Sequence, residues 1–259
     1  MKFIRFTIPG DTAVRSGTVE HAVIREFTGD LFGRFDYTGR QYALQDARLL
    51  APLLPRHIIG VGKNFAADHA EKPPVPELPV LFFKPQTSVI GPGEPIVLPP
   101  VPGSVKYESE LAVVIGRTVR NISAEDAASV IFGFTVSNDV SASSYYHSDG
   151  HWTIGKSFDT FCPLGPVIET EFDYRNARIQ SEVNGVLKQN CAIERMITPI
   201  DQLIAYISRF MTLSPGDVLL TGTPPGAVNI QQGDRVDCII EGIGRLSNPV
   251  QASQISETE

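Results

Sequence analysis

The sequence lacks the features of several large classes of protein. It has no run of lysine and arginine, and its 22 basic against 29 acidic side chains give a formal net charge of -7. The positive surface of a nucleic-acid-binding protein is therefore missing, and an anionic membrane is excluded as a partner on the same ground. No stretch approaches the roughly 18 uninterrupted apolar residues of a membrane-spanning helix. The first residues run directly into a strand pattern and do not form a signal peptide, so we expect a cytoplasmic protein.

Cysteine is also scarce. Cys162, Cys191 and Cys238 are odd in number, widely spaced and without a CxxC pair. This pattern predicts reduced thiols that serve as packing residues in the cytosol. Glycine and proline are more frequent, at 22 and 20 residues, which indicates many turns between short strands.

The chain divides into a small and a large region. Its 259 residues are 42% apolar and 20% charged, as in folded globular proteins. Up to residue 50 short apolar alternations, such as Ile4, Phe6 and Ile8, predict a small antiparallel β domain. A denser region without a linker-like segment follows, so we predict a second domain over residues 51–259.

Strand patterns dominate over helical ones. Three helices are predicted: one capped by Thr198 with Pro199 at its first position and ending before Ser214, one from Ser123 to about Ile131, and a short one capped by Asn64. The main predicted strands cover residues 80–84, 107–115, 134–140, 179–184, 217–221 and 235–241. The predicted fold class is therefore β-rich α+β.

Three carboxylates stand at the ends of predicted strands. Alternation places Glu108 and Glu110 on one face of a strand whose second half is apolar on both faces, and Asp139 ends another mostly apolar run. Buried carboxylates cost several kcal/mol unless they are paired or bind a metal ion. Three of them suit a hard cation such as Mg²⁺, Mn²⁺ or Ca²⁺, whereas the spacings typical of zinc sites are absent. The alternative is that the two glutamates lie in the solvent-exposed first part of an amphipathic strand and that Asp139 caps a turn.

Nine segments from residue 60 to residue 244 carry a resemblance to a known family. They are Gly60–Phe65, Asp68-His69, Leu81–Pro85, Ile90–Gly93, Tyr107–Leu111, Asn138–Ala142, Gly155–Phe161, Gly216–Pro224 and Glu241–Gly244. With these segments in this order the chain resembles the short bacterial and mitochondrial-type members of the fumarylacetoacetate hydrolase superfamily. The resemblance implies a mixed β-sandwich roll, a homodimer, and a divalent ion, first of all Mg²⁺, held by Glu108, Glu110 and Asp139.

The same resemblance implies chemistry on a small anionic 2-oxo acid. Members of the family hydrolyse or decarboxylate a carbon–carbon bond, or tautomerise a dienoate, with the developing enolate stabilised by the metal ion and a nearby cation. We expect first a hydrolase that cleaves an acylpyruvate or related β-diketo acid. The alternatives are an isomerase or decarboxylase of a 2-hydroxydienedioate or an oxaloacetate-like acid, and, from a different class, a non-catalytic binder of 2-oxo acids.

Lys156 and Thr223 are the substrate-binding residues that the resemblance implies. Lys156 would bind the substrate oxyanion, and Thr223 would donate its hydroxyl or backbone N–H to the substrate carboxylate. The alternatives are a solvated lysine paired with Asp159 and a turn residue ahead of Pro224.

His69 is the candidate general base, because its side chain changes protonation nearest neutral pH. The family places a glutamate three residues after this histidine, but here Lys72 stands there and Glu71 stands at the second position. Residues two apart on a helix do not face each other. Either Pro73 and Pro74 unwind the segment so that Glu71 approaches, or His69 works alone. A surface histidine on a lid is the further alternative.

The wall of the expected pocket departs from the family as well. Relatives commonly have arginine where Ser143 stands and glutamine where Tyr146 stands, and both positions are expected to touch substrate. The loss of a bidentate anion donor at position 143 predicts an altered pocket. Lys84 and Lys63 are further basic groups near the expected cleft, as substrate contacts or as structural residues.

Overall fold

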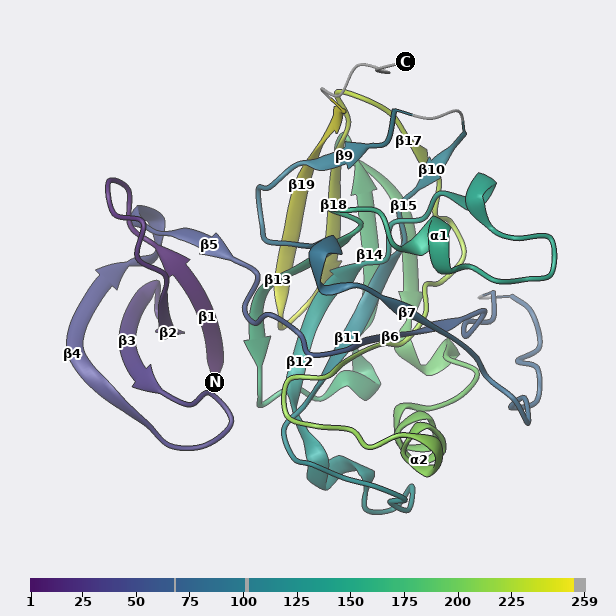
Figure 1. The fold of residues 1–259 in the computed structure, drawn as a ribbon, viewed down its shortest axis with the longest axis horizontal. Coiled ribbons are helices and arrows are strands. Elements are labelled where there is room, and N and C mark those ends of the chain that lie inside the picture. Colours follow the sequence, from purple (N-terminus) through teal and green to yellow (C-terminus); the bar gives the residue numbers. More distant parts are fainter. Residues whose placement is uncertain (68, 101–102, 254–259) are drawn as a thin grey trace.

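The computed structural model describes residues 1–67, 69–100 and 103–253. Its N-terminal unit, drawn in purple at the left of Figure 1, is a meander of antiparallel strands with one further strand paired to β1. The alternation read from the sequence is present, because Ile4 and Phe6 are buried in β1. The strands are β1 (Lys2–Thr7), β2 (Arg15–Glu20), β3 (Val23–Gly29), β4 (Phe35–Ala43) and β5 (Arg48–Leu50).

The N-terminal unit continues into the main sheet of the larger body. Lys2 pairs with Glu169 and Phe3 with Ile168, so that β1 lies beside β13 in a 12-stranded sheet. From β13 the sheet runs through β12, β11, β16, β6 and β7. The bounds are β13 (Cys162–Glu169), β12 (Ile131–Asn138), β11 (Ser109–Ile115), β16 (Val218–Leu220), β6 (Ile58–Gly62), β7 (Val80–Lys84) and the short β8 (Val89–Ile90), which pairs with β13.

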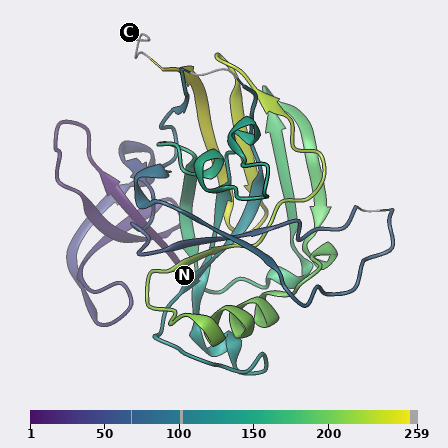
Figure 2. The same cartoon turned by 45° about the vertical axis from the view of Figure 1, so that its right-hand side comes forward.

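A five-stranded sheet packs against β11 and β12. Leu111 and Val113 of β11 share a buried core with Ile179 and Ile240 of this second sheet. The two views in Figures 1 and 2 show the packed strands, with β6 and β7 crossing in front of them. The sheet contains β15 (Val186–Ala192), β14 (Arg178–Val183), β18 (Arg235–Ile240), β19 (Gly244–Ala252) and β9 (Ile96–Leu98), and a separate pair joins β10 (Val105–Lys106) to β17 (Asn229–Ile230).

This strand-rich arrangement confirms the predicted fold class. The strand expected over residues 80–84 is found with those bounds. The strand expected over 107–115 begins only at Ser109, and the one expected over 134–140 ends at Asn138. Glu108 and Asp139 therefore lie just beyond the ends of their strands.

The helical predictions hold only in part. Helix α2 (Ile200–Phe210) is present, but it begins at Ile200 and its N-cap is Pro199. The Thr198 hydroxyl, which was expected to cap it, accepts no hydrogen bond among the described residues, and the Thr198 N–H donates to the Asn64 side chain. Between Ser123 and Ile131 the α-helical prediction is wrong, because this segment forms only a 3-10 turn. Short 3-10 helices cover Leu44–Asp46, Gln86–Ser88, Ala127–Val130, Ser143–Tyr145, Tyr174–Asn176 and Ile193–Arg195.

The predicted cap at Asn64 is also wrong, since no helix follows it in residues 65–67 and 69–79. Asn64 is buried, and its amide donates to the carbonyl groups of Thr198 and Thr221. Its short polar side chain thus ties the loop after β6 to two other loops. A short helix that was not predicted, α1 (Thr153–Lys156), carries Lys156.

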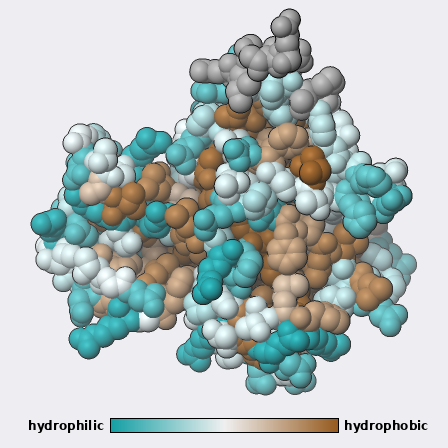
Figure 3. Space-filling view, in the orientation of Figure 1, coloured by the Kyte–Doolittle hydropathy of each residue, from teal (hydrophilic) through white to brown (hydrophobic). Residues whose placement is uncertain are grey.

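On the face shown in Figure 3, apolar side chains gather in the middle of the larger body and in the N-terminal unit, and polar side chains dominate the periphery. Among the described residues, no helix combines the length and apolar character needed to cross a membrane. The division into domains at residues 50 and 51 stays a prediction, although strand pairing between β1 and β13 crosses it.

Candidate active site

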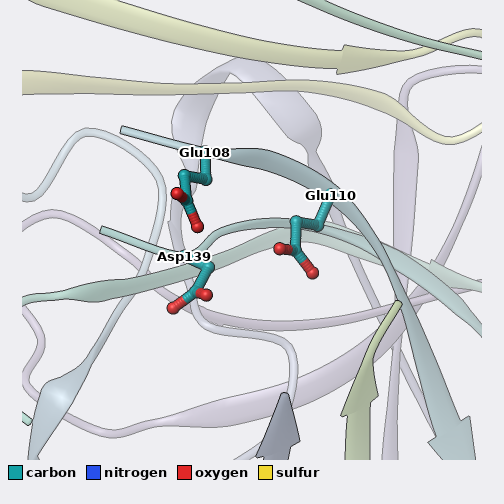
Figure 4. A group of neighbouring side chains, drawn as sticks. All are labelled: Glu108, Glu110 and Asp139. Carbon is teal, nitrogen blue, oxygen red and sulfur yellow. The ribbon is translucent and has the colours of Figure 1, made fainter. Parts of the chain in front are cut away.

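The three carboxylates predicted as metal ligands lie together. Oxygen atoms of Glu108, Glu110 and Asp139 lie within 4.8 Å of one another, and all three residues are buried. Strand pairing brings them together: Ser109 lies opposite Asn138, and the Asp139 N–H donates to the Glu108 carbonyl at 2.8 Å. Figure 4 shows the three carboxylate groups around one space.

Two of the three carboxylates have lysine partners. Lys156 Nζ donates to Glu108 Oε2 at 2.9 Å and also to Asp139 Oδ2. Lys84 Nζ donates to Asp139 Oδ1 at 2.7 Å, and Lys106 Nζ lies 2.8 Å from Glu108 Oε1. Burial alone would raise the pKa of Asp139, but the charges of Lys156 and Lys84 outweigh it and lower that pKa. Burial likewise opposes the charge of Lys156, yet Asp139 and Glu108 raise its pKa.

Glu110 has no such partner. Among the described residues no ammonium or guanidinium group forms an ion pair with it, and its Oε2 accepts only the Gly222 N–H, at 2.7 Å. Burial, followed by the charges of Asp139 and Glu108, raises the pKa of Glu110 well above its usual range. A buried carboxylate that lacks a cation, beside two others within reach of one point, fits a hard divalent ion. The trio can therefore hold a metal ion.

A cavity of about 280 Å³ opens above the trio, a size that suits a small ligand. Aromatic rings form part of its wall: Lys156 Nζ lies 4.6 Å from the Phe82 ring centroid, and Tyr146 stacks on Trp152 at 5.4 Å. Burial raises the pKa of Tyr146 and so favours its protonated hydroxyl. Gly155 allows this close packing, because a Cβ there would lie 2.5 Å from the Ala142 carbonyl oxygen. The cavity thus has an ionic floor and an aromatic wall.

The predicted substrate-binding residues divide into two groups. Ser143, Tyr146 and Thr223 line the cavity. The Thr223 hydroxyl donates to the Ser109 carbonyl and accepts from Gln189, so its hydrogen atom is already used. Lys84 does not line the cavity: its side chain is 0% exposed and held by Asp139 and the Val140 carbonyl. We therefore reassign Lys84 from substrate contact to a residue that positions Asp139.

His69 and Glu71 are not brought to the site. Both are exposed, neither lines the cavity, and the described residues around them form no helix. Asp68, which belonged to the motif, lies outside the described residues. Lys72, which stands at the family's glutamate position, instead donates to the Glu194 carbonyl at 3.3 Å. The role of His69 and Glu71 as a proton relay stays a prediction that this arrangement does not support.

Two residues of the site escaped the sequence analysis. Lys106 lines the cavity and contacts Glu108, and alternation with Glu108 and Glu110 was a signal that could have found it. Gln189 is buried and donates to both Thr223 and the Pro224 carbonyl. No local pattern announces Gln189, because it comes from a strand of the other sheet.

Comparison with known families identifies the fold around this site. The family model described as fumarylacetoacetate (FAA) hydrolase C-terminal matches residues 57–251. The chain belongs to the fumarylacetoacetate hydrolase family. A second model, described as Rv2993c-like, N-terminal, matches residues 1–52. This chain is thus an enzyme of the superfamily that its motifs resemble.

Three relatives illustrate the range of the family. A 5-carboxymethyl-2-hydroxymuconate delta-isomerase from Mycobacterium smegmatis is 43% identical, with a TM-score of 0.91 over 98% of this chain and 100% of that chain. The mitochondrial oxaloacetate tautomerase fahd2 of Xenopus laevis is 44% identical over 217 residues, which are 78% of this chain and 68% of the relative. The maleylpyruvate hydrolase from Sphingobium sp. SYK-6, solved with manganese(II) and pyruvate, is 29% identical with a TM-score of 0.83 over 98% and 100% of the chains.

Proposed function

We propose that this enzyme is a divalent-metal-dependent tautomerase or isomerase of a small 2-oxo acid. The observation that carries the proposal is the buried trio Glu108, Glu110 and Asp139 beneath a small cavity, with the ammonium group of Lys156 bonded to two of the three carboxylates. Support comes from two relatives above 40% identity, one named as a tautomerase and the other as an isomerase.

The trio would hold Mg²⁺ or Mn²⁺, and the manganese(II) ion in the maleylpyruvate hydrolase structure supports this choice. When bound, such an ion supplies Lewis acidity that polarises the 2-oxo carbonyl of the substrate and acidifies the neighbouring C–H. Glu110 supplies the carboxylate that forms no ion pair with a lysine or arginine side chain among the described residues.

The chain's own residues stabilise the enolate and exclude water. Lys156 places a positive charge beside the developing enolate oxygen, and the rings of Phe82 and Trp152 reduce the access of water to that charge. Tyr146 offers a neutral hydroxyl as a proton donor on the cavity wall. The backbone N–H of Thr223 is the donor left for the substrate carboxylate, since the hydroxyl is already engaged.

Hydrolysis of an acylpyruvate is the second candidate. The 29% identical maleylpyruvate hydrolase favours it, but attack by water needs a group that accepts the proton of that water. Apart from the trio itself, the described lining contains no histidine and no carboxylate. Tautomerisation takes a proton from carbon and delivers one to oxygen without an attacking water, and the Tyr146 hydroxyl on the cavity wall is the group that would exchange these protons. A binder without turnover is the candidate from a different class.

The deciding experiment compares two assays with the same protein and Mg²⁺. The enol form of oxaloacetate is followed by its ultraviolet absorbance, and cleavage of an acylpyruvate is followed by the release of pyruvate. We expect oxaloacetate tautomerisation well above that of Mg²⁺ alone, abolished by EDTA and restored by Mg²⁺ or Mn²⁺. An Asp139→Asn variant controls for catalysis by the free ion.

Each other outcome selects a different function. Cleavage without tautomerisation would replace the proposal with a hydrolase. Binding of 2-oxo acids without turnover in either assay would make the protein a binder. Full activity of metal-free protein would remove the metal-dependent mechanism.

A further inference from the structure

The cavity holds more positive charge than the trio explains. Three lysines line it: Lys156 at the trio, and Lys63 and Lys106. Lys156 is 2% exposed, whereas the Lys106 side chain is 38% exposed and Lys63 is also exposed. Among the described residues Lys63 has no ion-pair partner. Two lysines therefore face the solvent side of the cavity, and one of them is unpaired.

Charge balance indicates what these two lysines are for. The three carboxylates and the two buried lysines, Lys84 and Lys156, leave one negative charge. A divalent ion would turn this into one positive charge, which the carboxylate of a 2-oxo acid would neutralise. Lys63 and Lys106 then remain as two cations beside one small cavity. Like charges in one cavity repel each other, so a second anionic group stabilises them.

The backbone of each lysine is fixed. Lys106 ends the short strand β10, and it also forms a bridge with Ser141, with its N–H and carbonyl bonded at 2.8 and 2.9 Å. Lys63 has a φ of 55°, a conformation that is rare for residues other than glycine, and it precedes the buried Asn64. When the backbone is already fixed, long side chains can bind a charged group with little further loss of conformational entropy in the loops.

We propose that Lys63 and Lys106 form the subsite for a second anionic group of the substrate, a carboxylate distal to the 2-oxo acid. The inference rests on the proposed function and goes beyond it, because it makes these two lysines the residues that select dicarboxylic over monocarboxylic 2-oxo acids. Ser143, which lines the same cavity, is neutral and cannot supply this charge.

The test measures binding with two pairs of acids matched in length. Calorimetry on the Mg²⁺-loaded protein compares oxaloacetate with 2-oxobutanoate, and 2-oxoglutarate with 2-oxopentanoate. We expect the diacid of at least one pair to bind roughly tenfold tighter than its monoacid, as a charge-assisted contact predicts.

Lys63→Met and Lys106→Met should each lower that preference several-fold, and higher ionic strength should lower it in the unsubstituted protein. Lys188→Met, an exposed lysine on β15 that does not line the cavity, is the matched control.

Lys106 also contacts Glu108, so the affinity for Mn²⁺ is measured in each variant by electron paramagnetic resonance. Equal affinity for diacid and monoacid in both pairs would overturn the proposal while leaving the proposed function intact. Loss of Mn²⁺ together with equal losses for both acids in Lys106→Met, and no effect in Lys63→Met, would also overturn it. Absence of binding by every acid would instead count against the proposed function, on which the subsite depends.

Discussion

At the scale of single residues, Lys156 donates hydrogen bonds to two buried carboxylates at once. Replacing it with methionine keeps the length of the side chain but leaves Glu108 and Asp139 without their shared partner. Because breaking a buried ion pair from one side costs about 3 to 5 kcal/mol, we expect Lys156→Met to destabilise the metal-free protein by an amount in this range. We expect turnover to fall by about a hundredfold, as for the loss of an oxyanion donor.

Urea unfolding with and without Mg²⁺ checks the stability effect. Added Mg²⁺ should restore part of the lost stability, because the ion supplies the missing positive charge. Lys188→Met should unfold as the unsubstituted protein does, within about 0.5 kcal/mol. A metal-free Lys156→Met protein as stable as the unsubstituted one would show that the carboxylates are not held by this lysine.

Glu110 should make metal binding and stability depend on pH. Its raised pKa means that, as the pH climbs above the usual carboxyl range, the unfolded chain loses this proton first. Stability of the metal-free protein therefore falls with rising pH until the pH passes the raised folded value. The lowered pKa of Asp139 acts in the opposite sense, so that its contribution is lost as the pH falls.

The Glu110→Gln variant isolates the Glu110 effect from that of Asp139. A divalent ion needs the ionised carboxylate, so metal binding should release a proton below the raised folded pKa, and affinity should rise with pH. Calorimetry in two buffers of different ionisation enthalpy measures this release. A proton count that does not change between the unsubstituted protein and Glu110→Gln would contradict the assignment.

The site could be predicted from the sequence where local alternation decides it. Glu108 and Glu110 stand two apart on an apolar strand, and alternation alone put them on one face. Their meeting with Asp139 depends on the register between β11 and β12, which the motif resemblance supplied and local pattern could not. The sequence left a substrate contact and a structural role open for Lys84, because its apolar flank in β7 does not reveal that the side chain bonds to Asp139.

At the scale of elements, helix α1 is the piece that holds Lys156 and the aromatic wall together. It is only four residues long, and Gly155 lies against the Ala142 carbonyl and the Tyr146 ring, 2.5 and 2.6 Å from where a Cβ would stand. A Gly155→Ala substitution must move either the ring or the helix. We expect turnover at least tenfold lower with a stability loss of about 1 to 3 kcal/mol.

Kinetics and far-ultraviolet circular dichroism test this expectation together. Thr153→Ala changes an exposed residue of the same helix and should leave turnover near that of the unsubstituted protein. Unchanged kinetics in Gly155→Ala would mean that the packing of Tyr146 and the helix has no bearing on the site.

Elements were predictable where a periodic pattern is long and undisturbed. Helix α2 and the strand over residues 80–84 follow from such patterns. The segment after Ser123 begins with residues typical of a helix start. However, strand β12 begins at Ile131, and only a short 3-10 helix forms before it. Asn64 looks like a helix cap, yet tertiary contacts to Thr198 and Thr221 use its side chain.

At the scale of the whole molecule, the N-terminal unit and the larger body share one sheet and part of one core. Strand β1 pairs with β13, and Phe3 and Phe27 belong to the same buried cluster as Ala112 and Leu220 of the central strands. The sequence predicts a domain boundary at residue 50, because a denser region without a linker-like segment follows the short apolar alternations there. Local sequence patterns could not show this pairing, which joins residues more than 160 positions apart.

Phe3→Ala tests whether this sharing makes the protein unfold as one unit. The Phe3 ring lies 5.9 Å from Phe27, 5.7 Å from Phe35 and 5.3 Å from Phe132, measured between ring centroids. Its loss should cost about 3 to 5 kcal/mol, as for other buried phenylalanines. Because Phe132 belongs to the larger body, we expect one cooperative unfolding transition, with its midpoint shifted equally in the fluorescence of the single Trp152 and in far-ultraviolet circular dichroism.

Val14→Ala, at an exposed site of the same unit, should shift the midpoint in neither signal. An early transition seen by circular dichroism alone, with Trp152 unaffected, would instead make residues 1–50 an independently folding domain, as their sequence pattern first predicts.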